Sequence, residues 1–172
     1  MKASKKGIQT ARLTLDSIRD TDRDALIALL RDETVKQTYM LPDFASDAEA
    51  EPLFDRLKAL SENPDRFVFG IYLENTLIGI LNDTEIQGDT VEMGYALLPA
   101  YYNRGYATEA FAAVIGHLFS KGFSTVLAGA FFENSASIRV MEKCGMTKIG
   151  RTESIDYRGV THLCVYYAIS SR

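Results

Sequence analysis

In the middle of this 172-residue chain, a strand pattern passes through a short glycine-containing loop into a long helix, and no other feature limits the fold as strongly. Residues 90–98 suit a strand that ends at Pro99. Beyond Gly105, apolar residues recur at the spacing of one helical face as far as Gly122: Phe111, Val114, Ile115, Leu118 and Phe119. A strand that leads directly into an amphipathic helix predicts a fold in which helices cover a sheet.

Strand and helix patterns also alternate along the rest of the chain. Further strands are expected at residues 12–15, 67–73, 77–81, 125–131, 147–154 and 160–169. Further helices are expected after an N-cap at Asp20, after a capping box of Ser46 with Glu49, and over residues 135–144 before Gly145. This order predicts an α/β (α+β) fold in a single domain over residues 1–172, with a mixed, mostly antiparallel sheet of about seven strands flanked by about four helices.

Charge and hydropathy exclude several classes of protein. The chain has 19 basic and 23 acidic residues and a net charge of -4, so it offers no basic surplus to neutralise a nucleic-acid backbone. No apolar run is long enough to span a membrane, and the basic start has no apolar stretch behind it to form a signal peptide. We therefore expect no nucleic-acid partner, no membrane partner and a cytoplasmic location.

Cysteine and histidine do not indicate a metal or redox site. Cys144 and Cys164 lie in apolar patterns without a close partner, so we expect both to be reduced core residues. His117 and His162 have no metal-ligand neighbours in the sequence, and no metal site is predicted.

The loop around Gly105 carries the strongest chemical signal. A helix start presents unpaired N–H groups and the positive end of the helix dipole, an arrangement that suits a phosphate. Gly105 permits close approach of the backbone, Arg104 can add a charge, and Thr108 can offer a hydroxyl. The alternative is an ordinary solvated turn before a helix.

The preceding strand has one face of mostly small residues, and Glu92 lies on that face. Val91, Met93, Tyr95 and Leu97 form the other face, since side chains alternate along a strand. A carboxylate among small residues needs a partner or water. Glu92 is therefore a candidate base, with a structural hydrogen bond or a solvated sheet surface as the alternative.

Four segments carry a resemblance to one family: Glu92-Met93-Gly94-Tyr95; Tyr102-Asn103-Arg104-Gly105-Tyr106-Ala107; Glu133-Asn134-Ser135-Ala136-Ser137 with the helix behind it; and Tyr157-Arg158-Gly159 before a last strand. Together they resemble the GNAT N-acetyltransferases, and within them the branch of the ribosomal-protein N-terminal acetyltransferases. The resemblance extends from Thr10 to Ile169.

The resemblance implies an acyltransferase that takes acetyl-CoA as co-substrate and moves the acetyl group to a primary amine by direct transfer through a tetrahedral intermediate. Glu92, acting through water, and Ser137 are the implied catalytic residues. The implied cofactor-binding residues are Leu97, Leu98, Tyr102, Asn103, Arg104, Gly105, Tyr106, Ala107, Thr108, Asn134 and Ser137. Helix capping alone is the alternative explanation for Asn134 and Ser137.

The chain departs from the family pattern at three positions. Tyr102 stands where many members have Gln or Arg, and Asn103 stands where this branch often has Gly. Met141 lies near the usual position of a tyrosine proposed to protonate the departing thiolate, and methionine cannot donate that proton. Ser137, Tyr102, Tyr106 and water remain as donors.

The sequence leaves the acceptor and the oligomeric state open, a homodimer included. A protein N-terminus and a small-molecule amine both fit the expected chemistry. Residues 36–44 are expected to form a loop, in which Tyr39, Met40 and Phe44 are candidates for an acceptor pocket or for simple apolar anchors. The alternative function is a non-catalytic acyl-CoA-binding module that senses the ligand or presents it to a partner.

Overall fold

The computed structural model of the protein describes residues 7–172. Residues 1–6, part of the predicted domain and of the basic start considered above, lie outside the described residues. The α-helices are α1 (Arg23–Arg31), α2 (Glu33–Lys36), α3 (Asp47–Glu62), α4 (Tyr106–Ser120) and α5 (Ser135–Lys143). The strands are β1 (Ile8–Gln9), β2 (Leu13–Asp16), β3 (Phe69–Leu73), β4 (Thr76–Gln87), β5 (Thr90–Leu97), β6 (Thr125–Phe131), β7 (Thr147–Tyr157) and β8 (Val160–Ser170).

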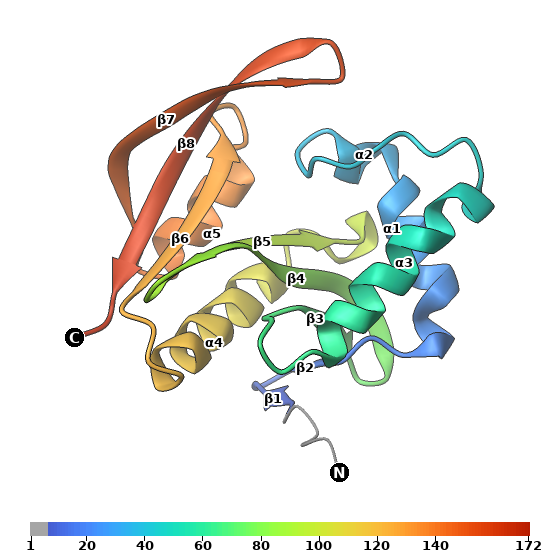
Figure 1. Cartoon of the computed structure of the whole chain (residues 1–172), viewed down its shortest axis with the longest axis horizontal. Helices are drawn as coiled ribbons and strands as arrows, with labels where there is room; N and C mark the ends of the chain where they lie inside the picture. Colours follow the sequence, from blue (N-terminus) through green and yellow to red (C-terminus); the bar gives the residue numbers. More distant parts are fainter. Residues whose placement is uncertain (1–6) are drawn as a thin grey trace.

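The strands form one mixed sheet with helices on both faces (Figure 1). Their order is β1-β2-β3-β4-β5-β6-β8-β7, and every neighbouring pair is antiparallel except β5 with β6. The predicted fold class is confirmed. The described residues form eight strands and five α-helices, one more of each than predicted. The two additional elements are the short β1 and α2, for which no pattern was recognised in the sequence.

Two apolar cores lie on opposite faces of this sheet. Met93 and Leu97 of β5 belong to the core beneath α4, whereas Ala96 belongs to the core beneath α1 and α3. The alternation predicted for this strand is thus confirmed, since neighbouring residues enter different cores. A glycine is required at position 79, where β4 meets β5, because a Cβ on Gly79 would lie 2.3 Å from the Ala96 carbonyl oxygen.

The helix starts agree with the sequence analysis at Ser46 and differ from it at Asp20. Ser46 caps α3 by accepting a hydrogen bond from the Glu49 N–H. Asp20 is wrong as the N-cap of α1, because a single 3-10 turn, η1 (Asp20–Asp22), precedes that helix. The carboxylate of Asp22 accepts from the Arg19 N–H at 2.7 Å and stabilises this turn instead.

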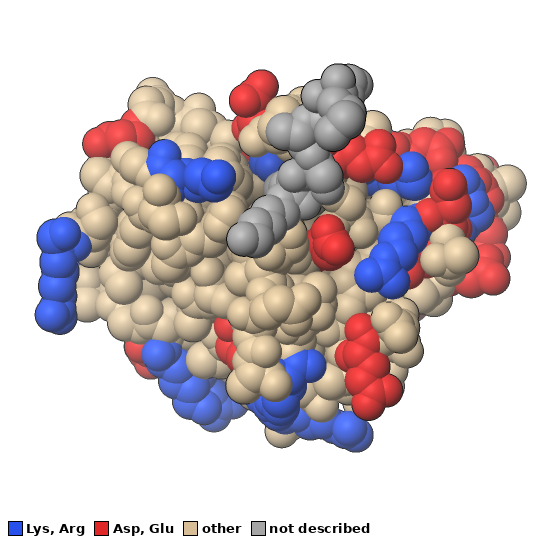
Figure 2. All heavy atoms as spheres, turned by 90° about the horizontal axis from the view of Figure 1, so that it is seen from below, with Lys and Arg blue, Asp and Glu red and all other residues tan. Residues whose placement is uncertain are grey.

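Figure 2 shows one face of the molecule, on which acidic and basic side chains are interspersed around broad uncharged areas. Among the described residues, no helix is long and apolar enough to cross a membrane. Cys144 and Cys164 are free thiols, the first half-buried and the second buried.

Candidate functional site

The two parallel strands at the centre of the sheet separate before they end, and this opens a cleft. β5 pairs with β6 only over three residues, from Thr90 to Glu92, opposite Thr125 to Leu127. Both strands continue past this point, and Figure 1 shows them diverging. Backbone groups along the inner edges of the fork are therefore turned toward a ligand site rather than toward a neighbouring strand.

A cavity of about 650 Å³ lies in this cleft, a size suited to a small-molecule ligand. Most of the predicted cofactor-binding residues line it: Leu97, Tyr102, Asn103, Gly105, Tyr106, Ala107, Thr108, Asn134 and Ser137. Leu98, Arg104 and the predicted base Glu92 lie outside the lining. The structure thus brings together three segments that are separate in the sequence, namely β5, the start of α4 and the start of α5.

The start of α4 directs backbone donors into the cavity. Its first intrahelical hydrogen bond runs from the Glu109 N–H to the Gly105 carbonyl at 3.0 Å, so the N–H groups of residues 106–108 have no intrahelical acceptor. Gly105 has a φ of 79° and Asn103 a φ of 60°, left-handed backbone that glycine adopts freely and asparagine tolerates. These N–H groups and the helix dipole together favour an anionic ligand.

Asn134 and Ser137 lie together at the start of α5. The Asn134 side-chain oxygen accepts a hydrogen bond from the Ser137 N–H at 3.1 Å, so the predicted capping is confirmed. Because the cap uses only the oxygen, the amide N–H groups of Asn134 remain for a ligand in the cavity. The capping and ligand-binding interpretations of Asn134 are therefore compatible.

Tyr95 is a cavity residue whose role the sequence analysis missed. Its hydroxyl reaches from β5 to α5, where it lies 2.8 Å from Ser137 Oγ and donates to the Ser137 carbonyl oxygen at 3.1 Å. Burial raises the pKa of this phenol, so it stays protonated. The sequence signal was present, because Tyr95 shares a strand face with Met93, but that alternation also suits an ordinary core residue.

Met141 lies away from the cavity. Its side chain is fully buried in the core beneath α4 and is not part of the lining. The missing tyrosine at this position therefore leaves no gap in the cavity wall.

The end of β5 has one backbone donor directed toward the cleft. The Leu98 N–H donates to the Ile78 carbonyl at 2.8 Å and is occupied by β4. Successive residues of an antiparallel strand direct their N–H groups to opposite edges. The Leu97 N–H is therefore directed away from β4, toward the opening between β5 and β6.

Glu92 lies at the base of the fork, at the last position where β5 pairs with β6. Its Oε2 accepts a hydrogen bond from Thr84 at 2.7 Å. Its Oε1 lies 3.6 Å from Arg151 Nη1 and is buried without a hydrogen-bond partner among the described residues. This oxygen can therefore accept a hydrogen bond from a water molecule.

The other wall of the cavity comes from α2 and the turn that follows it. Thr34, Gln37, Thr38 and Tyr39 line the cavity there, and the Tyr39 hydroxyl contacts Asn82 at 2.5 Å. Met40 is 52% exposed and outside the lining, and Phe44 packs against the core beneath α1 and α3. Of the three residues predicted for an acceptor pocket, only Tyr39 lines the cavity.

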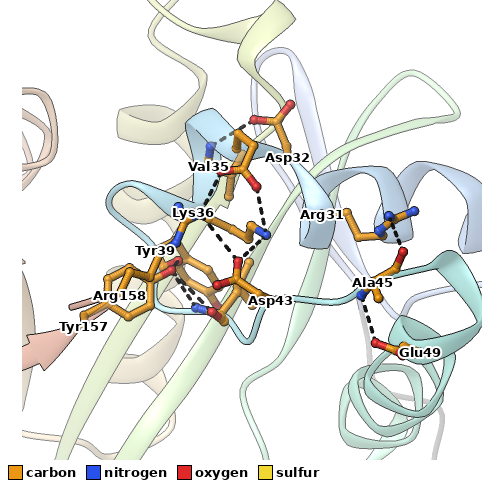
Figure 3. A network of polar contacts seen from close by, with 12 residues as sticks. Arg31, Asp32, Val35, Lys36, Tyr39, Asp43, Ala45, Glu49, Tyr157 and Arg158 are labelled. Carbon is orange, nitrogen blue, oxygen red and sulfur yellow. Dashed lines mark hydrogen bonds and ion pairs between the residues drawn. The ribbon is translucent and has the colours of Figure 1, made fainter.

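A cluster of ion pairs joins this wall to the tip of the β7–β8 hairpin (Figure 3). Lys36, whose side chain is only 4% exposed, contacts Glu33 at 3.1 Å and Asp43 at 2.7 Å. Arg158 at the hairpin tip contacts the same two carboxylates at 2.8 and 3.5 Å. We call these four residues the Lys36 cluster. The Tyr157 hydroxyl adds a second contact between the hairpin and this segment, because it accepts a hydrogen bond from the Leu41 N–H.

A protein-family model and a curated relative match most of the chain. The model described as "Acetyltransferase (GNAT) domain" matches residues 12–147. The uncharacterized N-acetyltransferase YoaA of Bacillus subtilis is 29% identical over 159 residues, which cover 90% of this chain and 90% of that protein.

Solved structures match the fold over almost its whole length. The acetyltransferase (GNAT family) from Bacillus anthracis has a TM-score of 0.83 at 26% identity, and the match covers 96% of this chain and 98% of that one. RimL, a ribosomal L7/L12 alpha-N-protein acetyltransferase solved in complex with coenzyme A, has a TM-score of 0.85 at 20% identity with the same coverage.

Proposed function

Because the chain belongs to the GNAT acetyltransferase family and is an acyltransferase, we propose that it transfers an acetyl group from acetyl-CoA to a primary amine. The observation that carries the proposal is the forked cleft, in which the N–H groups of residues 106–108 lie at one end and the Leu97 N–H at the other. Family membership supports an enzyme over the non-catalytic binding module considered above.

Acetyl-CoA fits this cleft by its chemistry. The pyrophosphate binds the N–H groups at the start of α4, where the helix dipole also favours negative charge. The pantetheine arm extends between β5 and β6 past the Asn134 amide. The thioester oxygen then accepts from the Leu97 N–H, which stabilises the oxyanion formed during attack.

The acceptor amine attacks the thioester carbonyl directly, and no covalent enzyme intermediate is needed. The attacking nitrogen transfers its proton through water to Glu92, whose Oε1 has no hydrogen-bond partner among the described residues. When the tetrahedral intermediate collapses, the C–S bond breaks and the thiolate takes a proton from Ser137. The serine proton is replaced from solvent, while Tyr95 holds the serine hydroxyl in place.

The acceptor binds on the wall formed by residues 34–39, beside Tyr39. RimL, which shares the fold, is an alpha-N-protein acetyltransferase of ribosomal L7/L12. We propose that the acceptor of this enzyme is a primary amine, carried by a protein N-terminus or by a small molecule. The enzyme acts as a homodimer or as a monomer.

The proposal is tested with Gly105→Val and a panel of amines. Valine at φ 79° is strained, and its Cβ would lie 3.3 Å from Arg12 Nη2. We expect calorimetry to detect acetyl-CoA binding to the wild type and a loss of about tenfold to hundredfold in the variant. A coenzyme A release assay then identifies the acceptor. Unchanged affinity in a folded Gly105→Val protein would overturn the assigned cofactor site.

A further inference from the structure

Arg12 contacts the cofactor loop from outside the cavity. It lies immediately before β2, and its Nη1 donates to the Arg104 carbonyl at 2.9 Å. Its Nε and its backbone N–H each donate to one Glu109 carboxylate oxygen, both at 2.7 Å. The guanidinium also lies 4.5 Å from the centre of the Tyr106 ring. One arginine thus contacts the residues on both sides of Gly105.

The contact with the Arg104 carbonyl fixes the peptide that joins Arg104 to Gly105. In a trans peptide, the carbonyl and the following N–H point in opposite directions. Because the Arg104 carbonyl is directed toward Arg12, the Gly105 N–H is directed to the side opposite Arg12. Gly105 lines the cavity, so this orientation turns one more donor toward the ligand.

Arg12 also compensates an unfavourable charge. Glu109 lies in the first turn of α4, beside the N–H groups that suit a phosphate, where a bare carboxylate would repel the ligand. Burial raises the pKa of Glu109, but hydrogen bonds from Thr10 and Arg12 outweigh it, and the net pKa is lowered. The carboxylate is therefore ionised at neutral pH, and Arg12 pairs with it directly.

We propose that Arg12 is a positioning residue for the cofactor pyrophosphate: it orients the peptide between Arg104 and Gly105 and neutralises Glu109. The inference rests on the proposed function, in which the start of α4 binds that pyrophosphate. It assigns a role to a residue outside the cavity, because Arg12 itself does not line the cavity.

The test compares coenzyme A with pantetheine, which lacks the pyrophosphate. In Arg12→Gln, we expect coenzyme A to bind about tenfold more weakly and pantetheine to bind as it does to the wild type. Arg12→Lys keeps the charge but cannot donate to Glu109 and to the Arg104 carbonyl in the same geometry. Lysine should therefore restore only part of the coenzyme A affinity.

Arg23→Gln is the matched control. Arg23 also lies over an aromatic ring, 4.3 Å from the centre of Phe54, and pairs with Glu51 and Asp55, and none of these residues lines the cavity. Its substitution should change neither affinity. Calorimetry measures coenzyme A binding, ligand-observed NMR measures pantetheine binding, and thermal unfolding checks that each variant is folded.

The outcomes separate this inference from the proposed function. Unchanged coenzyme A affinity in Arg12→Gln, or equal losses for both ligands, overturns the positioning role. If Arg12→Gln does not fold, Arg12→Lys decides by the same comparison. A wild-type protein that binds neither ligand contradicts the proposed cofactor site itself, before any variant is considered.

Discussion

The cavity has two halves that are built in different ways. The cofactor half is lined by residues 102–103 and 105–108 with Asn134 and Ser137, and its donors are mainly backbone groups at helix starts. The acceptor half is lined by residues 34–35 and 37–39, whose position depends on the Lys36 cluster and on Tyr157 of a distant hairpin. The first half is specified by local backbone geometry, and the second by contacts between side chains distant in sequence.

This difference predicts how each half responds to mutation. A backbone donor persists when its own side chain changes, so strained positions such as Gly105 should be the most sensitive in the cofactor half. In the acceptor half, removal of one charged partner takes away two of the ion pairs that hold residues 34–39 in place. Mutations in the two halves should therefore separate cofactor affinity from acceptor affinity.

The largest effect should come from Glu92→Gln, which removes the proposed general base. Glutamine keeps the shape of the side chain but cannot accept a proton, so kcat should fall by about 100-fold to 10,000-fold. The affinity for acetyl-CoA should not change. Steady-state kinetics with an acceptor identified by coenzyme A release measures the first quantity, and calorimetry measures the second.

Glu85→Gln provides the control for this experiment. Glu85 is exposed on β4 and pairs with Glu92 in the sheet register, so it tests the loss of a nearby carboxylate without the proposed base. Equal turnover in wild type and Glu92→Gln would remove Glu92 from the mechanism.

The second-largest effect should come from Lys36→Met, which should weaken acceptor binding alone. Methionine fills the buried space but leaves Glu33 and Asp43 with Arg158 as their one shared cation in the cluster. The KM for the acceptor should rise about tenfold to hundredfold, while the coenzyme A Kd stays constant. Lys58→Met is the control, since Lys58 pairs with Glu62 on the exposed side of α3.

A parallel loss of coenzyme A affinity in Lys36→Met would contradict the separation of the two halves. Thermal unfolding should accompany this measurement, because a general loss of stability would also lower the active fraction of the enzyme.

The cofactor half could be predicted from the sequence because its information is local. Gly105, the helix pattern after it and the N-cap at Asn134 each lie within a few residues of the groups they position. Leu98 shows the limit of this reasoning. Which edge of β5 its N–H faces depends on pairing with Ile78, which the sequence does not encode locally.

The acceptor half could not be predicted for a related reason. The sequence places Lys36 at the start of a loop, and nothing near it indicates that Arg158 will lie beside the same carboxylates. The role of Tyr95 is hidden in a similar way, because a tyrosine facing a core and a tyrosine reaching Ser137 have the same strand pattern.

A smaller effect should come from the two side chains at the start of α5. Ser137→Ala should lower kcat about tenfold, because a thiol with a pKa near 8.5 is already a fair leaving group and gains little from an acid. Asn134→Ala should weaken coenzyme A binding by a similar factor, through loss of one hydrogen bond and of the helix cap.

These two variants sharpen the comparison, because they test side chains within the half that depends mainly on backbone groups. Tyr95→Phe should reproduce part of the Ser137→Ala defect by removing the contact with the serine hydroxyl. Full activity in Ser137→Ala would reduce that serine to a first-turn residue of α5.

The smallest effect should be the response of the Lys36 cluster to acid. The Arg158 hydrogen bond lowers the pKa of Glu33, and the Lys36 hydrogen bond lowers the pKa of Asp43. A carboxylate whose pKa is lower in the folded state stabilises the fold above its unfolded pKa, and this contribution disappears as the pH falls through the folded value. Arg158→Gln removes part of it, so wild type and variant should differ in Tm at neutral pH and converge in acid.

Melting curves between about pH 7 and pH 3 measure this convergence, since that window spans the usual carboxylate pKa values. Both carboxylates are exposed, so the difference should be small and should shrink in high salt. Arg31→Gln is the control, because Arg31 pairs with Asp47 outside the cluster. A Tm difference for Arg158→Gln that stays constant across this range would mean that Arg158 acts by packing alone, and that the hairpin tip is not held to α2 by charge.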